Sequence, residues 1–140
     1  MKDLLNKIKA VSALDPVVVS ATGQLTDIDL MNFDSAVLLI SIGTDAGSGL
    51  SGSNKLVFTL SDSDDGSTYA AVDAVDVLGV TAASGVILTI DNTDEDNLLY
   101  AFGYVGGKRY LQLDYVETGS VSMPISILVV KGNGLDKPAI

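Results

Sequence analysis

The feature that most constrains the fold is a series of short apolar runs that begins at Pro16 and continues almost to the end of the chain. The runs are rich in Val, Ile, Leu, Phe and Tyr, and clusters of Gly, Asp, Ser and Asn separate them. Apolar runs of this kind, punctuated by turn residues, are typical of β-strands. About eight to ten such strands predict a single all-β domain, folded as an antiparallel β-sandwich with a jelly-roll-like arrangement.

One of these runs and two of the turn segments between them carry further information. The run 35–43 is apolar at nearly every position, which predicts a strand buried on both faces. The turn cluster 62–67 joins two runs and predicts a hairpin with an acidic tip. The pair Gly106-Gly107 predicts a two-residue hairpin between strands 99–105 and 108–116. The other predicted strands cover 17–20, 24–32, 55–61, 68–72, 76–80, 85–91 and 125–131.

The first fifteen residues differ from the rest of the chain. Leu4, Leu5, Ile8 and Val11 recur near helical spacing, and the Asp15-Pro16 step is expected to end a helix. The chain is therefore predicted to have a short N-terminal helical arm over residues 1–15. The β-sandwich domain is predicted over 16–132, and a flexible tail over 133–140. An arm this short needs a surface to dock on, either its own domain or a neighbouring protein.

Composition limits the possible functions. The chain contains neither His nor Cys, which removes the most common general base, thiol catalysis and thiolate zinc sites. We therefore expect no enzymatic activity and no cofactor. A formal net charge of −10 disfavours nucleic acid and anionic membrane surfaces as partners. No apolar segment is long enough to span a bilayer, and the N-terminus does not resemble a secretory signal.

Two acidic clusters are weak candidates for chemistry. Asp62, Asp64 and Asp65 could place carboxylates around a calcium ion, although their spacing does not match a helix-flanked calcium loop. An acidic turn in solvent is the commoner explanation, so no metal site is predicted. The second cluster is Asp91, Asp94, Glu95 and Asp96, where a carboxylate pair could serve sugar hydrolysis. Solvated loop carboxylates are again the commoner explanation.

The segment 104–110 is a candidate protein interface. Lys108 and Arg109 are the only adjacent basic pair in the acidic body of the chain, and tyrosine is concentrated around them. Tyr and Arg often dominate protein–protein contacts. The alternative is that Arg109 pairs with a local Asp while the tyrosines pack across strands. The predicted interface residues are Leu4, Leu5, Ile8, Tyr104, Lys108, Arg109 and Tyr110.

Several segments of the chain resemble a group of small virion proteins of tailed bacteriophages. They are MKDLLNKIKAV at the N-terminus, FTLSDSDDGSTYAAVDAVDVLGV, GYVGGKRYLQL and ISILVVKG. The resemblance extends from Met1 to about Gly132 and carries no catalytic residues. It implies a capsid decoration or cement protein, or the base of a head spike or fibre, on the outside of the capsid.

The resemblance also implies partners and a location. The partners would be the major capsid protein or other virion proteins, with the chain as a homo-oligomer. The location would be the virion, assembled in the host cytoplasm. The alternative from the sequence is a carbohydrate- or ligand-binding β-sandwich, such as an adhesin module. The lack of Trp counts against sugar binding, because sugar faces usually stack on aromatic rings.

Overall fold

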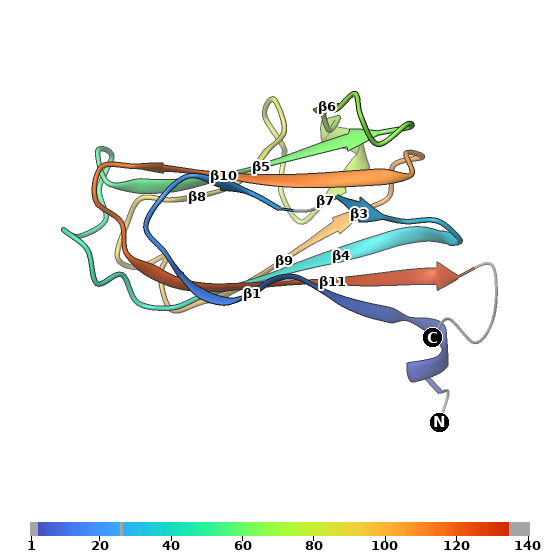
Figure 1. Ribbon diagram of the computed structural model, residues 1–140, viewed down its shortest axis with the longest axis horizontal. Helices are drawn as coiled ribbons and strands as arrows, with labels where there is room; N and C mark the ends of the chain where they lie inside the picture. Colours follow the sequence, from blue (N-terminus) through green and yellow to red (C-terminus); the bar gives the residue numbers. More distant parts are fainter. Residues whose placement is uncertain (1–2, 26, 135–140) are drawn as a thin grey trace.

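The computed structural model describes residues 3–25 and 27–134, which form two packed antiparallel β-sheets (Figure 1). The first sheet has the strand order β1-β11-β4-β9-β7. The second has the order β2-β10-β5-β6, with β3 also pairing with β10 and β8 with β5. From β4 onward the chain passes repeatedly from one sheet to the other. The predicted antiparallel, jelly-roll-like β-sandwich is therefore confirmed.

The strands match most of the predicted runs. Their bounds are β1 Lys9–Val19, β2 Gly23–Gln24, β3 Ile28–Asp29, β4 Phe33–Ile42, β5 Lys55–Ser63, β6 Ala70–Ala71, β7 Val77–Leu78, β8 Val86–Ile90, β9 Leu99–Tyr104, β10 Tyr110–Thr118 and β11 Met123–Gly134. Two 3-10 turns, η1 (Leu5–Lys7) and η2 (Ala74–Asp76), are the only helical elements of the described residues. Within that part of the chain no helix is long and apolar enough to cross a membrane.

The core lies between the two sheets and follows the alternation of each strand. In β4, Ala36, Leu38, Ile40 and Ile42 are buried, while Val37 between them is 40% exposed. The prediction that this strand is buried on both faces is therefore wrong. A strand of a two-layer sandwich has only one inner face, so its second set of apolar side chains lies on the outside of the molecule.

The N-terminal segment is a strand rather than a helical arm. Only Leu5–Lys7 make a 3-10 turn, and Lys9–Val19 pair with β11 along its length. The helical spacing was misleading because hydrogen bonds to β11 stabilise an extended backbone, whereas so short a helix gains little by itself. Pro16 does not end an element. It lies inside β1 next to irregularities in pairing, where an edge strand tolerates a residue without an N–H.

The two predicted hairpins have different outcomes. Strand β5 turns back into β6 through the acidic tip, with Ser61 opposite Ala71, so this hairpin is confirmed. The Gly106-Gly107 hairpin is wrong, because β9 pairs with β4 and β7 while β10 pairs with β5, β2 and β3. Residues 105–109 instead connect the two sheets (Figure 1). The glycine pair marks a turn correctly but carries no information about which sheet each flanking strand joins.

Residues 1–2, 26 and 135–140 lie outside the described residues, so most of the predicted C-terminal tail is not described. Its first two residues, Asn133 and Gly134, belong to β11.

Candidate protein-binding face

The outer side of the five-stranded sheet is an apolar surface that follows from the strand patterns. Val37 and Leu39 of β4 lie beside Val130 and Leu128 of β11 in the antiparallel register, and all four point away from the core. The neighbouring strand β9 adds Ala101 next to Leu39. The result is a continuous row of apolar side chains across three adjacent strands.

We call this surface the apolar face. Its members are the outward-facing residues Ala10, Ser12, Val37, Leu39, Ser41, Leu78, Leu99, Ala101, Gly103, Pro124, Ser126, Leu128 and Val130.

Several large side chains of the apolar face are open to solvent. Leu99 is 67% exposed, Leu78 54% and Leu128 44%. The position of Leu78 depends on a glycine, because a Cβ on Gly103 would lie 3.1 Å from the Cβ of Leu78. Gly103 thus lets Leu78 of β7 lie close over β9 and extend the apolar face by one strand.

Charge separates this face from the rest of the molecule. None of the outward-facing residues of β4, β7, β9 and β11 within the described ranges is charged, although the whole chain has a net charge of −10. At the β1 edge the face does meet a charge, because Ser12 donates a 2.6 Å hydrogen bond to the carboxylate of Asp15. On the outer side of the second sheet, Asp114 lies opposite Thr59, Gln112 opposite Ser61 and Thr118 opposite Lys55, with the apolar pair Val116 and Val57 among them. The outer side of the second sheet is therefore the more polar of the two.

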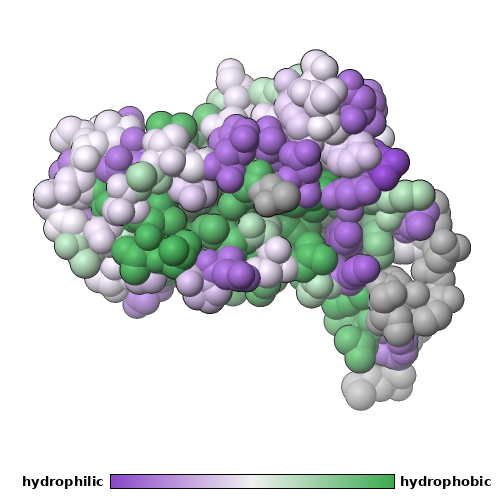
Figure 2. Space-filling view, viewed as in Figure 1, coloured by the Kyte–Doolittle hydropathy of each residue, from purple (hydrophilic) through white to green (hydrophobic). Residues whose placement is uncertain are grey.

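The flank of the sandwich along β1 also carries exposed apolar side chains. Val17 and Val18, at the end of β1, are 47% and 58% exposed. Figure 2 views the molecule from the side along which β1 runs, and it shows apolar surface between more polar regions above and below.

Tyr104, one of the predicted interface residues, is not available for contact. Its side chain is fully buried, and its hydroxyl donates a 2.9 Å hydrogen bond to Asp62. Burial raises the pKa of the Tyr104 hydroxyl, and the neighbouring Asp62 raises it further. Burial also raises the pKa of Asp62, although the bond from Tyr104 opposes that effect. The prediction for Tyr104 is wrong because this pair ties the 105–109 connection to β5 inside the molecule.

The basic pair on the same connection is engaged within the chain. Arg109 donates two hydrogen bonds to Asp29, of 2.9 and 2.8 Å, and its guanidinium lies 4.8 Å from the centre of the Tyr110 ring. Arg109 lowers the pKa of Asp29 to about 2. Lys108 forms an ion pair with Asp64. Both cations are partly exposed, so a role for Lys108, Arg109 and Tyr110 in binding stays a prediction.

The predicted N-terminal contact residues lie at the start of the chain's first strand. Leu4 and Leu5 are 65% and 72% exposed beside the 3-10 turn, and Ile8 is half-buried. They do not join Lys108 and Arg109 in one site, since no contact links the two groups among the described residues. Their role in binding also stays a prediction.

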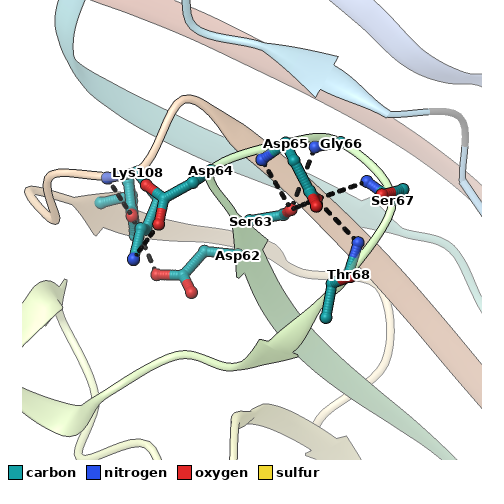
Figure 3. Close-up of polar contacts among 9 residues, drawn as sticks. Asp62, Ser63, Asp64, Asp65, Gly66, Ser67, Thr68 and Lys108 are labelled. Atoms are coloured by element: carbon teal, nitrogen blue, oxygen red, sulfur yellow. Dashed lines mark hydrogen bonds and ion pairs between the residues drawn. The ribbon is translucent and has the colours of Figure 1, made fainter.

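The acidic hairpin tip uses its carboxylates to build the turn (Figure 3). Asp65 accepts hydrogen bonds from the Ser63 hydroxyl and from the backbone N–H groups of Ser67 and Thr68, at 2.8 to 2.9 Å. These bonds hold the pKa of Asp65 well below its usual range. Asp62 points inward and Asp64 pairs with Lys108 (Figure 3). The three carboxylates therefore have separate partners rather than a common centre.

No group of three or more Asp or Glu side chains in residues 3–25 and 27–134 is placed to hold a metal ion. The second acidic cluster also serves the backbone. Glu95 accepts from the N–H groups of Asp91 and Asn92, and Asp96 accepts from that of Asp45. These carboxylates order their loops.

Sequence reasoning missed the apolar face, although a signal was present. The alternation of β4, β9 and β11 places apolar residues on both sides of each strand, and a two-layer sandwich can bury only one of the two sets. The apolar residues that the core cannot bury form the apolar face.

Comparison with known proteins places the fold. No family model matches the chain, and no curated protein sequence matches it significantly. Among solved structures, the SPBc2 prophage-derived protein YomS overlays with a TM-score of 0.51 at 10% identity, covering 89% of this chain and 91% of YomS. The PBSX exported protein XepA overlays with a TM-score of 0.52 at 14% identity, covering 91% of this chain and 38% of XepA. At these identities the similarity shows a shared fold.

Proposed function

We propose that this chain is a non-enzymatic structural protein of a bacteriophage particle. In this role it binds other virion proteins on the outside of the capsid, as a decoration or cement protein or as the base of a spike or fibre. The observation that carries the proposal is the apolar face, a broad surface on a strongly acidic protein with no charged residue among its outward-facing positions on β4, β7, β9 and β11.

An exposed apolar surface of this kind is the property of a protein that works in contact with other proteins. Large apolar patches on folded proteins usually mark binding sites, because water contact with them is unfavourable. Depletion of charged residues is likewise characteristic of the centre of a protein interface. The acidic remainder of the surface would keep the free protein soluble until assembly.

Two further observations support a phage particle as the setting. The segments quoted above resemble small virion proteins, and YomS, which shares the fold, is described as prophage-derived. Both point to the same biological source without depending on each other.

The sugar-binding alternative has less support. All eight aromatic residues lie in the described part of the chain, and each of them is buried or half-buried. A ring that stacks on a sugar must present an open face.

The proposal is tested by locating the protein in particles. Phage particles from the source that carries this gene are purified on a density gradient, and the chain is quantified against the major capsid protein by mass spectrometry. We expect a fixed ratio in the particle band, and labelling of intact particles by an antibody to the chain. Recovery of the chain only in the soluble fraction would refute the proposal.

A further inference from the structure

We infer that the apolar face is the contact through which two copies of this chain associate. The inference rests on the protein-binding role proposed above and deepens it, because it makes a second copy of the chain the protein that covers the apolar face. Its support comes from the charge of the face, its shape and the protection of the sheet edges.

Charge favours a second copy at this face. Two chains that each carry −10 repel one another, and the repulsion is smallest where the facing surfaces have no charge. The centre of the apolar face, on β4, β9 and β11, meets this condition, and Asp15 lies only at its β1 edge. The outer side of the second sheet would instead bring Asp114 of one copy towards acidic residues of the other.

Shape favours the same arrangement. The outward residues of β4 and β11 form a compact block of four branched side chains, Val37, Leu39, Leu128 and Val130, at the centre of the face. Small residues surround it, among them Ser12, Ser41, Ala101 and Ser126. Two antiparallel sheets pack well when their faces are flat and side chains interdigitate about 10 Å apart. Two-fold symmetry would place this block against its own copy.

The size of the face sets the expected strength of the contact. Four strands about 4.8 Å apart, over about six residues at 3.3 Å each, give a flat area of roughly 400 Å². That is within the range of patches that function as binding sites, and smaller than the roughly 800 Å² per partner of a tight complex. We therefore expect a reversible dimer that dissociates on dilution.

The edges of the first sheet are poorly suited to the alternative, edge-to-edge association. Its edge strand β1 contains Pro16 and two irregularities of register. At the other edge, β7 is only two residues long. Interrupted and very short edge strands do not template a further strand. Association through the open face is thus favoured over extension of the sheet.

The test is sedimentation velocity of the full chain over a range of concentrations, at low and high NaCl. We expect the sedimentation coefficient to rise with concentration, and the dimer to be tighter at high salt, because salt screens the repulsion between the two acidic chains. A contact held by ion pairs would instead weaken with salt. A chain that stays monomeric at every concentration and at both salt levels would overturn the inference.

Variants at matched positions locate the contact. Leu128→Lys places a charge at the centre of the face, and we expect it to raise the dissociation constant at least tenfold even though it reduces the net negative charge. Val116→Lys is the control, since Val116 is 45% exposed on the outer side of β10 and Leu128 is 44% exposed. Loss of the dimer in the control variant but not in Leu128→Lys would overturn the assignment to this face. Far-UV circular dichroism checks that both variants fold.

Cross-linking tests the same contact without placing a charged side chain on the apolar face. The chain has no Cys, so Leu128→Cys and Val116→Cys each introduce a single thiol. We expect a short bifunctional maleimide to join two chains through Cys at 128 and not through Cys at 116. Equal cross-linking at both positions would contradict the inference. Incorporation into particles is measured separately, so a monomeric chain that still enters particles would refute the dimer and leave the proposed function intact.

Discussion

At the scale of single residues, the hydroxyl of Tyr104 links the two sheets through a hydrogen bond. It donates to Asp62 on β5 and accepts a 3.3 Å hydrogen bond from the backbone N–H of Lys108. The Tyr104 side chain on β9, in the first sheet, is thereby fixed to the Asp62 carboxylate on β5, in the second sheet.

Removing this hydroxyl leaves a buried acceptor without its donor. We expect Tyr104→Phe to lower the free energy of unfolding by about 1–3 kcal/mol, because Asp62 stays buried and loses its hydrogen bond. Urea denaturation measures the change. Tyr115→Phe is the control, since no hydrogen bond of the Tyr115 hydroxyl is present in the described part of the chain, and an effect below about 0.5 kcal/mol is expected. Equal effects in the two variants would contradict the role of Tyr104.

Asp62 also gives the molecule a predictable response to pH. Burial raises its folded-state pKa above the ordinary value of 3.8, so the folded state binds the proton more tightly than the unfolded state does. Its contribution to stability is therefore complete below the unfolded pKa and is lost as the pH rises through the folded pKa.

The comparison of wild type with Asp62→Asn isolates this effect, because the amide does not titrate. We expect the stability of the wild type relative to the variant to fall as the pH rises from about 3 to about 7. Chemical denaturation at a series of pH values measures the difference. A difference that is constant over this range, or that changes in the opposite direction, would show that burial does not raise the pKa of Asp62.

At the scale of the elements, the start of β8 depends on one backbone conformation. Gly85 has φ of +80°, and its carbonyl accepts a 2.8 Å hydrogen bond from the N–H of Leu60. A Cβ at this position would lie 2.7 Å from the backbone oxygen of Leu60. The residue thus needs both the left-handed conformation and the missing side chain that glycine provides.

We expect Gly85→Ala to lower the free energy of unfolding by about 1–3 kcal/mol, since it adds backbone strain and a clash with β5. Thermal or urea denaturation reports the loss. Gly107→Ala is the matched control, because nothing lies within 4 Å of a Cβ at Gly107. A Gly85→Ala variant as stable as this control would mean that β8 can shift away from β5 without cost.

The elements also show what local patterns can and cannot predict. Strands β4, β5, β8 and β11 follow from their apolar runs, because alternation and turn residues are local properties. The first strand does not, since the helical spacing of the N-terminal leucines and Ile8 extends to Val11, whereas in the structure Val11 lies in β1 opposite Val129 of β11. The partners of β9 and β10 are likewise a tertiary property that no glycine pair encodes.

At the scale of the whole molecule, the apolar face could be predicted only in part. The sequence contains both apolar sets of β4, but which set faces outward depends on where the second sheet packs. The composition predicts an acidic surface but does not show that the outward-facing residues of four neighbouring strands, β4, β7, β9 and β11, carry no charge.

The net charge of −10 leads to a prediction for the folded chain as a whole. Repulsion among carboxylates is greater in the compact state, so NaCl should stabilise the protein by screening it. We expect an increase on the order of 1 kcal/mol between low and moderate salt, or about 3–5 °C in Tm, measured at protein concentrations where the chain is monomeric. A smaller response is expected for Asp94→Lys, which changes the net charge by two. A Tm that does not change with salt would contradict this account.

The pairing of the first strand with the last has a consequence for how the chain is made. Lys9 lies opposite Lys131 and Val19 opposite Met123, so β1 gains its hydrogen-bonded neighbour only after residues 123–131, more than a hundred positions further along, have left the ribosome. Until then β1 has no strand to pair with, and the side of the sandwich along which β1 lies stays exposed to solvent. Closing so long a loop is slow, as it is in β-sandwiches generally. Newly synthesised copies would thus pass through an interval in which the inner apolar layer is unprotected, before the final strand is in place.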